Sequence, residues 1–234
     1  MSGVRPSLSE CRLAVVLSRQ RPTPVISLIR SSRGRPSVEC VTETTLPQRK
    51  GLVDRWPTAL ALVVIVGAIM TIALVDREAE LFGPAVATMA GIYLVAYAIG
   101  RPWTAWLAFV ALSAVVSLFH LLQRSGGWDV DPAVGMTVVL VVLWLWAVAR
   151  RRYTDAGTFS VQTAGMLGFG AITLVCAAVE PRLGVALAGA GILAHGAWDA
   201  YHFKADKIVN RHWSEFCCVV DVGVGAALII AAAA

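Results

Sequence analysis

Four ionisable side chains near the C-terminal end of the chain have the types and spacing that metal binding or proton exchange requires. His195, Asp199 and His202 stand at positions i, i+4 and i+7 of one apolar segment. At about 100° per residue these positions fall within an arc of about 60° on a helix, so all three face one direction. Asp221 lies in the next apolar segment, four residues after Cys217 and therefore on the same side of its helix.

The depth of these residues in a membrane groups them further. His195 and Asp221 each lie roughly seven residues, or about 10 Å, from the same predicted end of two antiparallel helices. A charged side chain at the centre of a span costs about 2.5–3.5 kcal/mol on insertion scales, so such residues mark functional sites. We therefore predict a pocket of His195, Asp199 and Asp221 between the sixth and seventh spans, open to the cytoplasmic side.

The composition of the chain identifies the elements that must position this pocket. Of 234 residues, 57% are hydrophobic and 15% are charged, and the mean hydropathy is +0.70. Soluble domains carry roughly 45–50% apolar and about 25% charged residues. The sequence therefore predicts an integral membrane protein, and it excludes nucleic-acid-binding proteins and secreted disulfide scaffolds.

Seven apolar runs are long enough to span a bilayer, which takes about 20 residues as a helix. They cover residues 57–75, 82–100, 103–122, 132–149, 160–179, 182–202 and 214–233. The predicted fold is an all-α polytopic membrane bundle of seven transmembrane helices over residues 51–234. Small residues in the fifth and sixth runs predict close packing of that pair. The bulky fourth run is expected to be the most exposed to lipid.

Basic residues in the short connections predict the orientation. With the N-terminus inside and the C-terminus outside, ten Lys and Arg residues fall on the cytoplasmic side and three on the other. We expect a multi-pass protein of the cell membrane, of the bacterial inner-membrane type. Its expected partners are the lipid bilayer and a second copy of the chain or another membrane protein, with no nucleic acid.

Residues 1–50 form a tail with nine Lys and Arg residues against three acidic ones. Their apolar runs are too short for the core of a signal peptide. Three interpretations remain open: a disordered cytosolic arm attracted to anionic lipid, an organelle transit peptide, and translated sequence upstream of the true start. In each, the tail is expected to be dispensable for membrane insertion.

Several classes of function are compatible with the pocket. A retinal protein is excluded, because Lys50, Lys204 and Lys207 all lie in flanks or connections. An intramembrane metal-dependent hydrolase remains open, with zinc or iron held by His195, Asp199, His202 and Asp221. A proton-linked carrier of a small solute and a purely structural tie between two helices also remain open. The leading interpretation is an integral membrane protein of unassigned activity, such as an accessory subunit or a lipid-interacting factor. The polar residues Tyr93, Tyr97, Gln162 and Thr163 are expected to serve as packing or tie residues.

The segment around the pocket resembles a pattern of small multi-pass bacterial membrane proteins. That pattern is His-Gly-x-Trp-Asp-x-x-His, a short basic connection, then Phe-Cys and an Asp. Here it is formed by His195, Gly196, Trp198, Asp199, His202, Phe216, Cys217 and Asp221. It covers about 30 of the 234 residues. The resemblance implies where such proteins keep their polar residues and implies no particular reaction.

Overall fold

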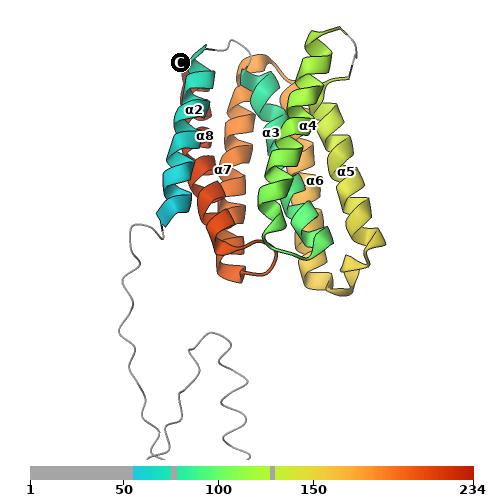
Figure 1. Cartoon of the computed structure of the whole chain (residues 1–234). Coiled ribbons are helices and arrows are strands. Elements are labelled where there is room, and N and C mark those ends of the chain that lie inside the picture. The colour runs from blue at the N-terminus through green and yellow to red at the C-terminus, as the bar shows by residue number, and fades with distance from the viewer. Residues whose placement is uncertain (1–54, 75–77, 127–129) are drawn as a thin grey trace, which may run out of the picture. The chain divides into compact units, whose positions relative to one another are not determined.

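The structure, a computed structural model, describes residues 55–74, 78–126 and 130–234, without the side chains of residues 78–80. Within these ranges the fold is all-helical, and seven helices are long and apolar enough to cross a membrane (Figure 1). This confirms the predicted fold class. The helices are α2 (Trp56–Leu74), α3 (Glu78–Ile99), α4 (Thr104–Arg124), α5 (Pro132–Ala149), α6 (Ala156–Ala178), α7 (Pro181–Ala205) and α8 (Arg211–Ala233), with a short turn η2 (Arg152–Thr154) before α6. The predictions for residues 1–50 lie outside the described residues.

Capping residues set several helix ends that the hydropathy pattern misplaces. Asp155 accepts hydrogen bonds from the amide and the hydroxyl of Thr158, so α6 begins four residues before the predicted 160. Asn210 accepts a hydrogen bond from the amide of Trp213, so α8 begins before the predicted 214. Helix α3 begins before the predicted 82, which places Pro84 inside the helix and beyond its first turn.

Helix α3 lies at the centre of the bundle. It packs against α4, α5, α6 and α7, and it is the most buried of the seven spanning helices. Small residues allow these neighbours to approach: a Cβ atom at Gly91 would lie 3.0 Å from the side chain of Leu112 on α4. This central position brings Tyr93, a fully buried side chain of α3, into the middle of the fold.

Among the seven spanning helices α2 has the smallest buried share, so the expectation that the run at 132–149 is the most exposed is wrong. Two residues of α2 are buried, whereas α5 buries six. Helix α5 uses Met136 and Leu140 to pack into the core that it shares with α3. Helix α2 packs chiefly on α8, where the hydroxyl of Thr58 donates a 2.7 Å hydrogen bond to Glu215.

Glycines bring α7 and α8 into backbone contact. A Cβ atom at Gly189 would lie 2.9 Å from the carbonyl oxygen of Gly225, and one at Gly225 would lie 2.9 Å from the carbonyl oxygen of Gly189. Seven residues after Gly189, a Cβ atom at Gly196 would lie 3.3 Å from the Cβ atom of Asp221. The α7–α8 interface is the most extensive among the described helices, larger than the predicted α6–α7 contact.

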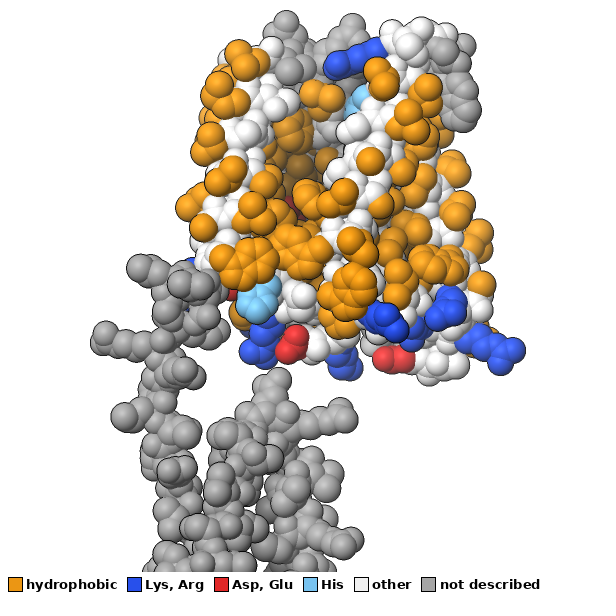
Figure 2. All heavy atoms as spheres, viewed as in Figure 1, with side chains coloured by type: hydrophobic (Ala, Val, Ile, Leu, Met, Phe, Trp, Pro, Cys, Tyr) orange, Lys and Arg blue, Asp and Glu red, His pale blue; other side chains and the backbone are white. Residues whose placement is uncertain are grey.

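Basic side chains gather at one end of the bundle, at the lower edge in Figure 2. This end carries the α3–α4, α5–α6 and α7–α8 connections, and we call it the basic end. Its basic residues are Arg55, Arg101, Arg150, Arg151, Arg152, Lys204, Lys207 and Arg211. Arg124 and Arg182 are the described basic residues of the opposite end. The described basic residues thus divide between the two ends of the bundle in the way that the sequence predicts.

Candidate functional site

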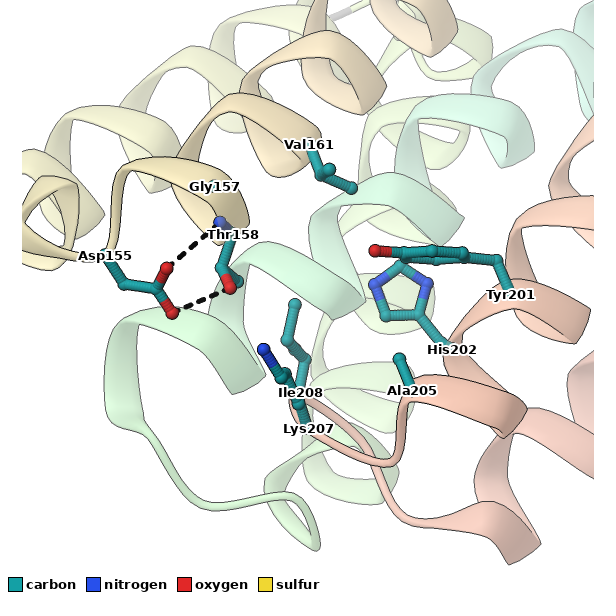
Figure 3. Close-up of a pocket in the computed structure, with 9 residues that line it drawn as sticks. All are labelled: Asp155, Gly157, Thr158, Val161, Tyr201, His202, Ala205, Lys207 and Ile208. Carbon is teal, nitrogen blue, oxygen red and sulfur yellow. Dashed lines mark hydrogen bonds between the residues drawn. The ribbon is translucent and has the colours of Figure 1, made fainter.

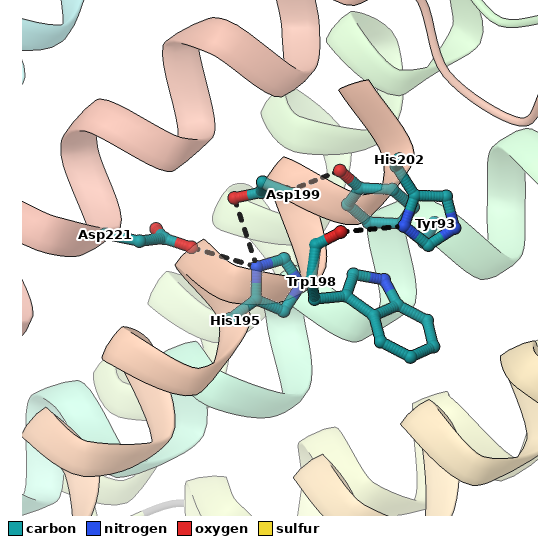
Figure 4. A network of polar contacts seen from close by, with 6 residues as sticks. All are labelled: Tyr93, His195, Trp198, Asp199, His202 and Asp221. Carbon is teal, nitrogen blue, oxygen red and sulfur yellow. Dashed lines mark hydrogen bonds and ion pairs between the residues drawn. The ribbon is translucent and has the colours of Figure 1, made fainter. Parts of the chain in front are cut away.

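His195, Asp199 and Asp221 meet between α7 and α8 (Figure 4). The Nδ1 atom of His195 lies 2.9 Å from Oδ2 of Asp221 and 3.5 Å from Oδ2 of Asp199. Each side chain is at most 1% exposed. The three offer one nitrogen and two oxygen atoms that all lie within 4.8 Å of one another. We call these three residues the His–Asp cluster.

Helix geometry explains why these residues meet. His195 stands ten residues before the end of α7, and Asp221 stands ten residues after the start of α8. At 1.5 Å per residue both lie about 15 Å from the basic end. This is deeper than the sequence predicts, because α7 and α8 extend beyond their apolar runs, but the two depths match as expected. The close approach at Gly196 then brings Asp221 within hydrogen-bond distance of His195.

Tyr93 on α3 extends the His–Asp cluster to a third helix. Its hydroxyl donates a hydrogen bond to Oδ1 of Asp199. Its ring centroid lies 5.5 Å from that of His195, and the ring of Phe169 on α6 covers His195 at 4.9 Å. Asp199 is therefore oriented by a fixed donor, while apolar rings exclude water from the imidazole.

Several polar atoms around the His–Asp cluster have no hydrogen-bond partner among the described residues. They include Nε2 of His195, Oδ1 of Asp221, Oδ2 of Asp199 and the hydroxyl of Ser214. A buried polar atom without a partner costs about 1–3 kcal/mol, and more when it is charged. Oδ1 of Asp221 has no partner among the described residues, and Oδ2 of Asp199 has only the 3.5 Å contact with His195, so both leave acceptor capacity that a bound cation would satisfy.

His202, the fourth residue proposed from the sequence, lies outside the His–Asp cluster. Its Nδ1 atom lies 2.9 Å from the carbonyl oxygen of Trp198, and its Nε2 atom lies 3.1 Å from Nε2 of Gln162. Because the amide of Gln162 donates, Nε2 accepts and Nδ1 donates to the carbonyl oxygen. Both ring nitrogens are thus engaged, and His202 ties α7 to α6.

Cys217 and the other polar residues take supporting positions. Cys217 is buried on the same face of α8 as Asp221 but is not part of the group of ligand atoms. Thr163 accepts a 2.9 Å hydrogen bond from the indole of Trp144, and Tyr97 donates to the carbonyl oxygen of Arg152. These two act as ties, as expected from the sequence.

The sequence pattern gives no sign that Tyr93 contacts the His–Asp cluster. The helix ends in the structure reveal a match that the predicted spans do not: Tyr93 stands six residues before the end of α3, and Asp199 stands six residues before the end of α7. Both helices end at the basic end, so the two residues share one depth. Equal depth does not establish that two helices are neighbours. The packing of α3 on α7 depends on how all the helices of the bundle are arranged.

The charges of the His–Asp cluster indicate what it can hold. Two carboxylates and one imidazole carry at most one positive charge, so with both carboxylates ionised the cluster has a negative balance. Isolated negative charge in the interior of a membrane protein is costly, and protons or a metal ion neutralise it. The arrangement suits a cation.

Comparison of the chain with protein-family models, with curated proteins and with solved structures finds no match.

Proposed function

We propose that this membrane protein binds a divalent transition-metal ion in the His–Asp cluster. The observation that carries the proposal is the convergence of three buried ligand atoms from two helices within 4.8 Å. One imidazole nitrogen and two carboxylate oxygens form a ligand set suited to zinc, iron(II) or manganese.

The distances in the His–Asp cluster fit such an ion. Zinc takes nitrogen and oxygen ligands at about 2.0–2.2 Å, so neighbouring ligands of a tetrahedral site lie about 3.3–3.5 Å apart. The separations from Nδ1 of His195 to the two aspartates are 2.9 Å and 3.5 Å. The separation to Asp199 matches this spacing, whereas the shorter one to Asp221 would have to lengthen on binding. A neutral imidazole and two carboxylates also balance the charge of a divalent ion.

Tyr93 supplies the support that metal ligands in proteins usually have. Hydrogen bonds to the ligating carboxylates and imidazoles fix their orientation. The hydroxyl of Tyr93 already holds Oδ1 of Asp199, which leaves Oδ2 facing His195. The site is in this sense organised for a ligand before one binds.

Burial favours a carrier of the ion over a hydrolase. A catalytic metal keeps an open position for water or substrate, whereas all three side chains of the His–Asp cluster are enclosed. A carrier needs its ion enclosed at one stage of transport. The second candidate, a proton-linked carrier without metal, is favoured by the 2.9 Å contact between His195 and Asp221, because that hydrogen bond forms without an ion.

Metal binding to the purified protein separates these proposals. The protein in detergent is stripped with a chelator and titrated with Zn²⁺ or Co²⁺ in a calorimeter. We expect a single ion per chain, with binding lost in Asp221→Asn and in Asp199→Asn. Asp206→Asn makes the same change at an exposed position, and it should bind as the parent does.

Two results would contradict the metal proposal. One is the absence of stoichiometric binding by a monodisperse parent protein. The other is undiminished binding by Asp221→Asn. In either case, proton flux in proteoliposomes that is lost in Asp221→Asn would support the second candidate, and its absence would leave a structural tie.

A further inference from the structure

A cavity of about 330 Å³ opens near the basic end, between the start of α6 and the end of α7 (Figure 3). It is lined by Asp155, Gly157, Thr158, Val161, Tyr201, His202, Ala205, Lys207 and Ile208. Apolar and polar surface both contribute to its wall. A cavity of this size accommodates several water molecules, each of which occupies about 30 Å³ in the liquid.

His202 forms the inner wall of this cavity and belongs to the layer that covers the His–Asp cluster. The centroid of its ring lies 4.6 Å from that of Tyr93, and the hydroxyl of Tyr93 donates to Asp199. The rings of His202 and then Tyr93 therefore separate the cavity from Asp199. Figure 4 shows Tyr93 between His202 and Asp199.

His202 is held in this layer by hydrogen bonds and by the neighbouring rings of Tyr93, Trp198 and Tyr201. His202 is fixed by Gln162 and by the carbonyl oxygen of Trp198. The indole of Trp198 rests on α6, where a Cβ atom at Gly165 would lie 2.8 Å from it. A rotamer change of His202 would break these two hydrogen bonds and its contacts with the three neighbouring rings.

Two opposite charges stand at the mouth of the cavity. The side chain and backbone amide of Thr158 donate hydrogen bonds to Asp155, which lowers the pKa of that carboxyl and keeps it ionised at neutral pH. Lys207 is exposed beside it on the α7–α8 connection. The mouth therefore presents one group that attracts a metal cation and one that repels it.

We propose that this cavity is the port through which the divalent ion reaches the His–Asp cluster from the basic end, with His202 as its inner gate. The inference rests on the proposed function, because it assigns a route to the ion that the His–Asp cluster would bind. The ion passes the mouth at Asp155 and displaces water in the cavity. It reaches Asp199 when the ring of His202 swings aside and the ring of Tyr93, the next one inward, gives way.

The rate of loading tests the port, and the affinity tests the site. Co²⁺ is mixed with the stripped protein in a stopped-flow instrument, and its binding is followed by absorption or by quenching of tryptophan fluorescence. Val161→Trp fills the cavity, and we expect it to slow loading by about tenfold or more, with the equilibrium affinity unchanged. The matched control is Leu167→Trp, which places the same side chain on the exposed face of α6.

Two further variants keep the test independent of how Val161→Trp folds. Lys207→Gln removes the repelling charge at the mouth, so loading should be faster at low ionic strength and this gain should vanish in high salt. Lys204→Gln removes a neighbouring exposed charge outside the cavity and serves as its control. His202→Ala opens the gate and should also load faster than the parent.

The outcomes distinguish failure of the port from failure of the site. A parent protein that binds no metal refutes the proposed function, and the port falls with it. A parent that binds metal, with Val161→Trp loading as fast as Leu167→Trp and Lys207→Gln as fast as Lys204→Gln, refutes the port alone.

Discussion

Among single residues, Tyr93 offers the substitution that perturbs the proposed site with the least change to the bundle. Tyr93→Phe keeps the buried ring and removes the donor to Oδ1 of Asp199. Loss of a partner of this kind weakens metal binding by about 10- to 100-fold. We expect that loss of Zn²⁺ affinity, measured by calorimetry, with a helical content like that of the parent.

Tyr97→Phe is the matched control on the same helix. Its hydroxyl donates to the carbonyl oxygen of Arg152, away from the His–Asp cluster. The control should bind Zn²⁺ as the parent does. Equal affinities in Tyr93→Phe and the parent would show that the hydroxyl of Tyr93 does not orient a ligand.

The contact between His195 and Asp221 makes a second prediction at the residue scale. Residues in direct contact show interaction energies of about 0.5–3 kcal/mol in double-mutant cycles, whereas distant pairs add within about 0.3–0.5 kcal/mol. We expect His195→Ala and Asp221→Asn to be non-additive in the free energy of unfolding, measured by denaturant titration in detergent without metal. Additive losses would place the two side chains out of contact.

Residue types and spacing predicted the His–Asp cluster but not the different role of His202. His195, Asp199 and His202 all lie on one face of α7, so helical periodicity alone groups the three residues. His202 stands about one turn nearer the basic end than Asp199 does. At that level α6 presents the side chain of Gln162 to Nε2 of His202. Which neighbour meets a given turn depends on helix packing, and one helical wheel carries no information about that packing.

Glycines determine how closely the helices α7 and α8 approach each other. Gly189→Ala would place a Cβ atom 2.9 Å from the carbonyl oxygen of Gly225, a backbone atom that cannot turn aside. Overpacking of this kind costs about 1–3 kcal/mol. We expect a lower unfolding temperature, measured by thermal denaturation in detergent, and a weaker affinity for metal because the two ligand-bearing helices are pushed apart.

Gly168→Ala on α6 separates packing from helix propensity. A Cβ atom there meets nothing within 4 Å, and alanine favours a helix over glycine by about 0.5–1 kcal/mol. This control should be as stable as the parent or more so. If Gly189→Ala proved equally harmless, the glycine contact would not set the spacing of α7 and α8.

Hydropathy predicted the existence and number of the spanning helices, because apolar length is a local property of the chain. The predicted starts of α6 and α8 lie too late in the chain, because Asp155 and Asn210 cap those helices within polar sequence. The exposure of α5 was misjudged for another reason. A bulky apolar helix suits lipid and core equally well, and the packing of α3, α4 and α6 around α5 decides which of its faces is buried.

The distribution of charge over the whole molecule leads to the last prediction, the orientation in the membrane. Among the described residues, eight of the ten Lys and Arg side chains lie at the basic end. Short connections rich in these residues remain in the cytoplasm. We therefore expect the basic end to face the cytoplasm and the end of α8 to face the other side. A fluorescent protein that matures only in the cytoplasm tests this when fused after Thr154 and, separately, after Ala234.

The first fusion should fluoresce and the second should stay dark. Fluorescence of both, or only of the fusion at Ala234, would refute the orientation. The result also decides where the proposed port opens, because the cavity between α6 and α7 lies near the basic end. With the expected orientation, the His–Asp cluster would receive its ion from the cytoplasm. With the reverse orientation, the same residues would receive it from outside.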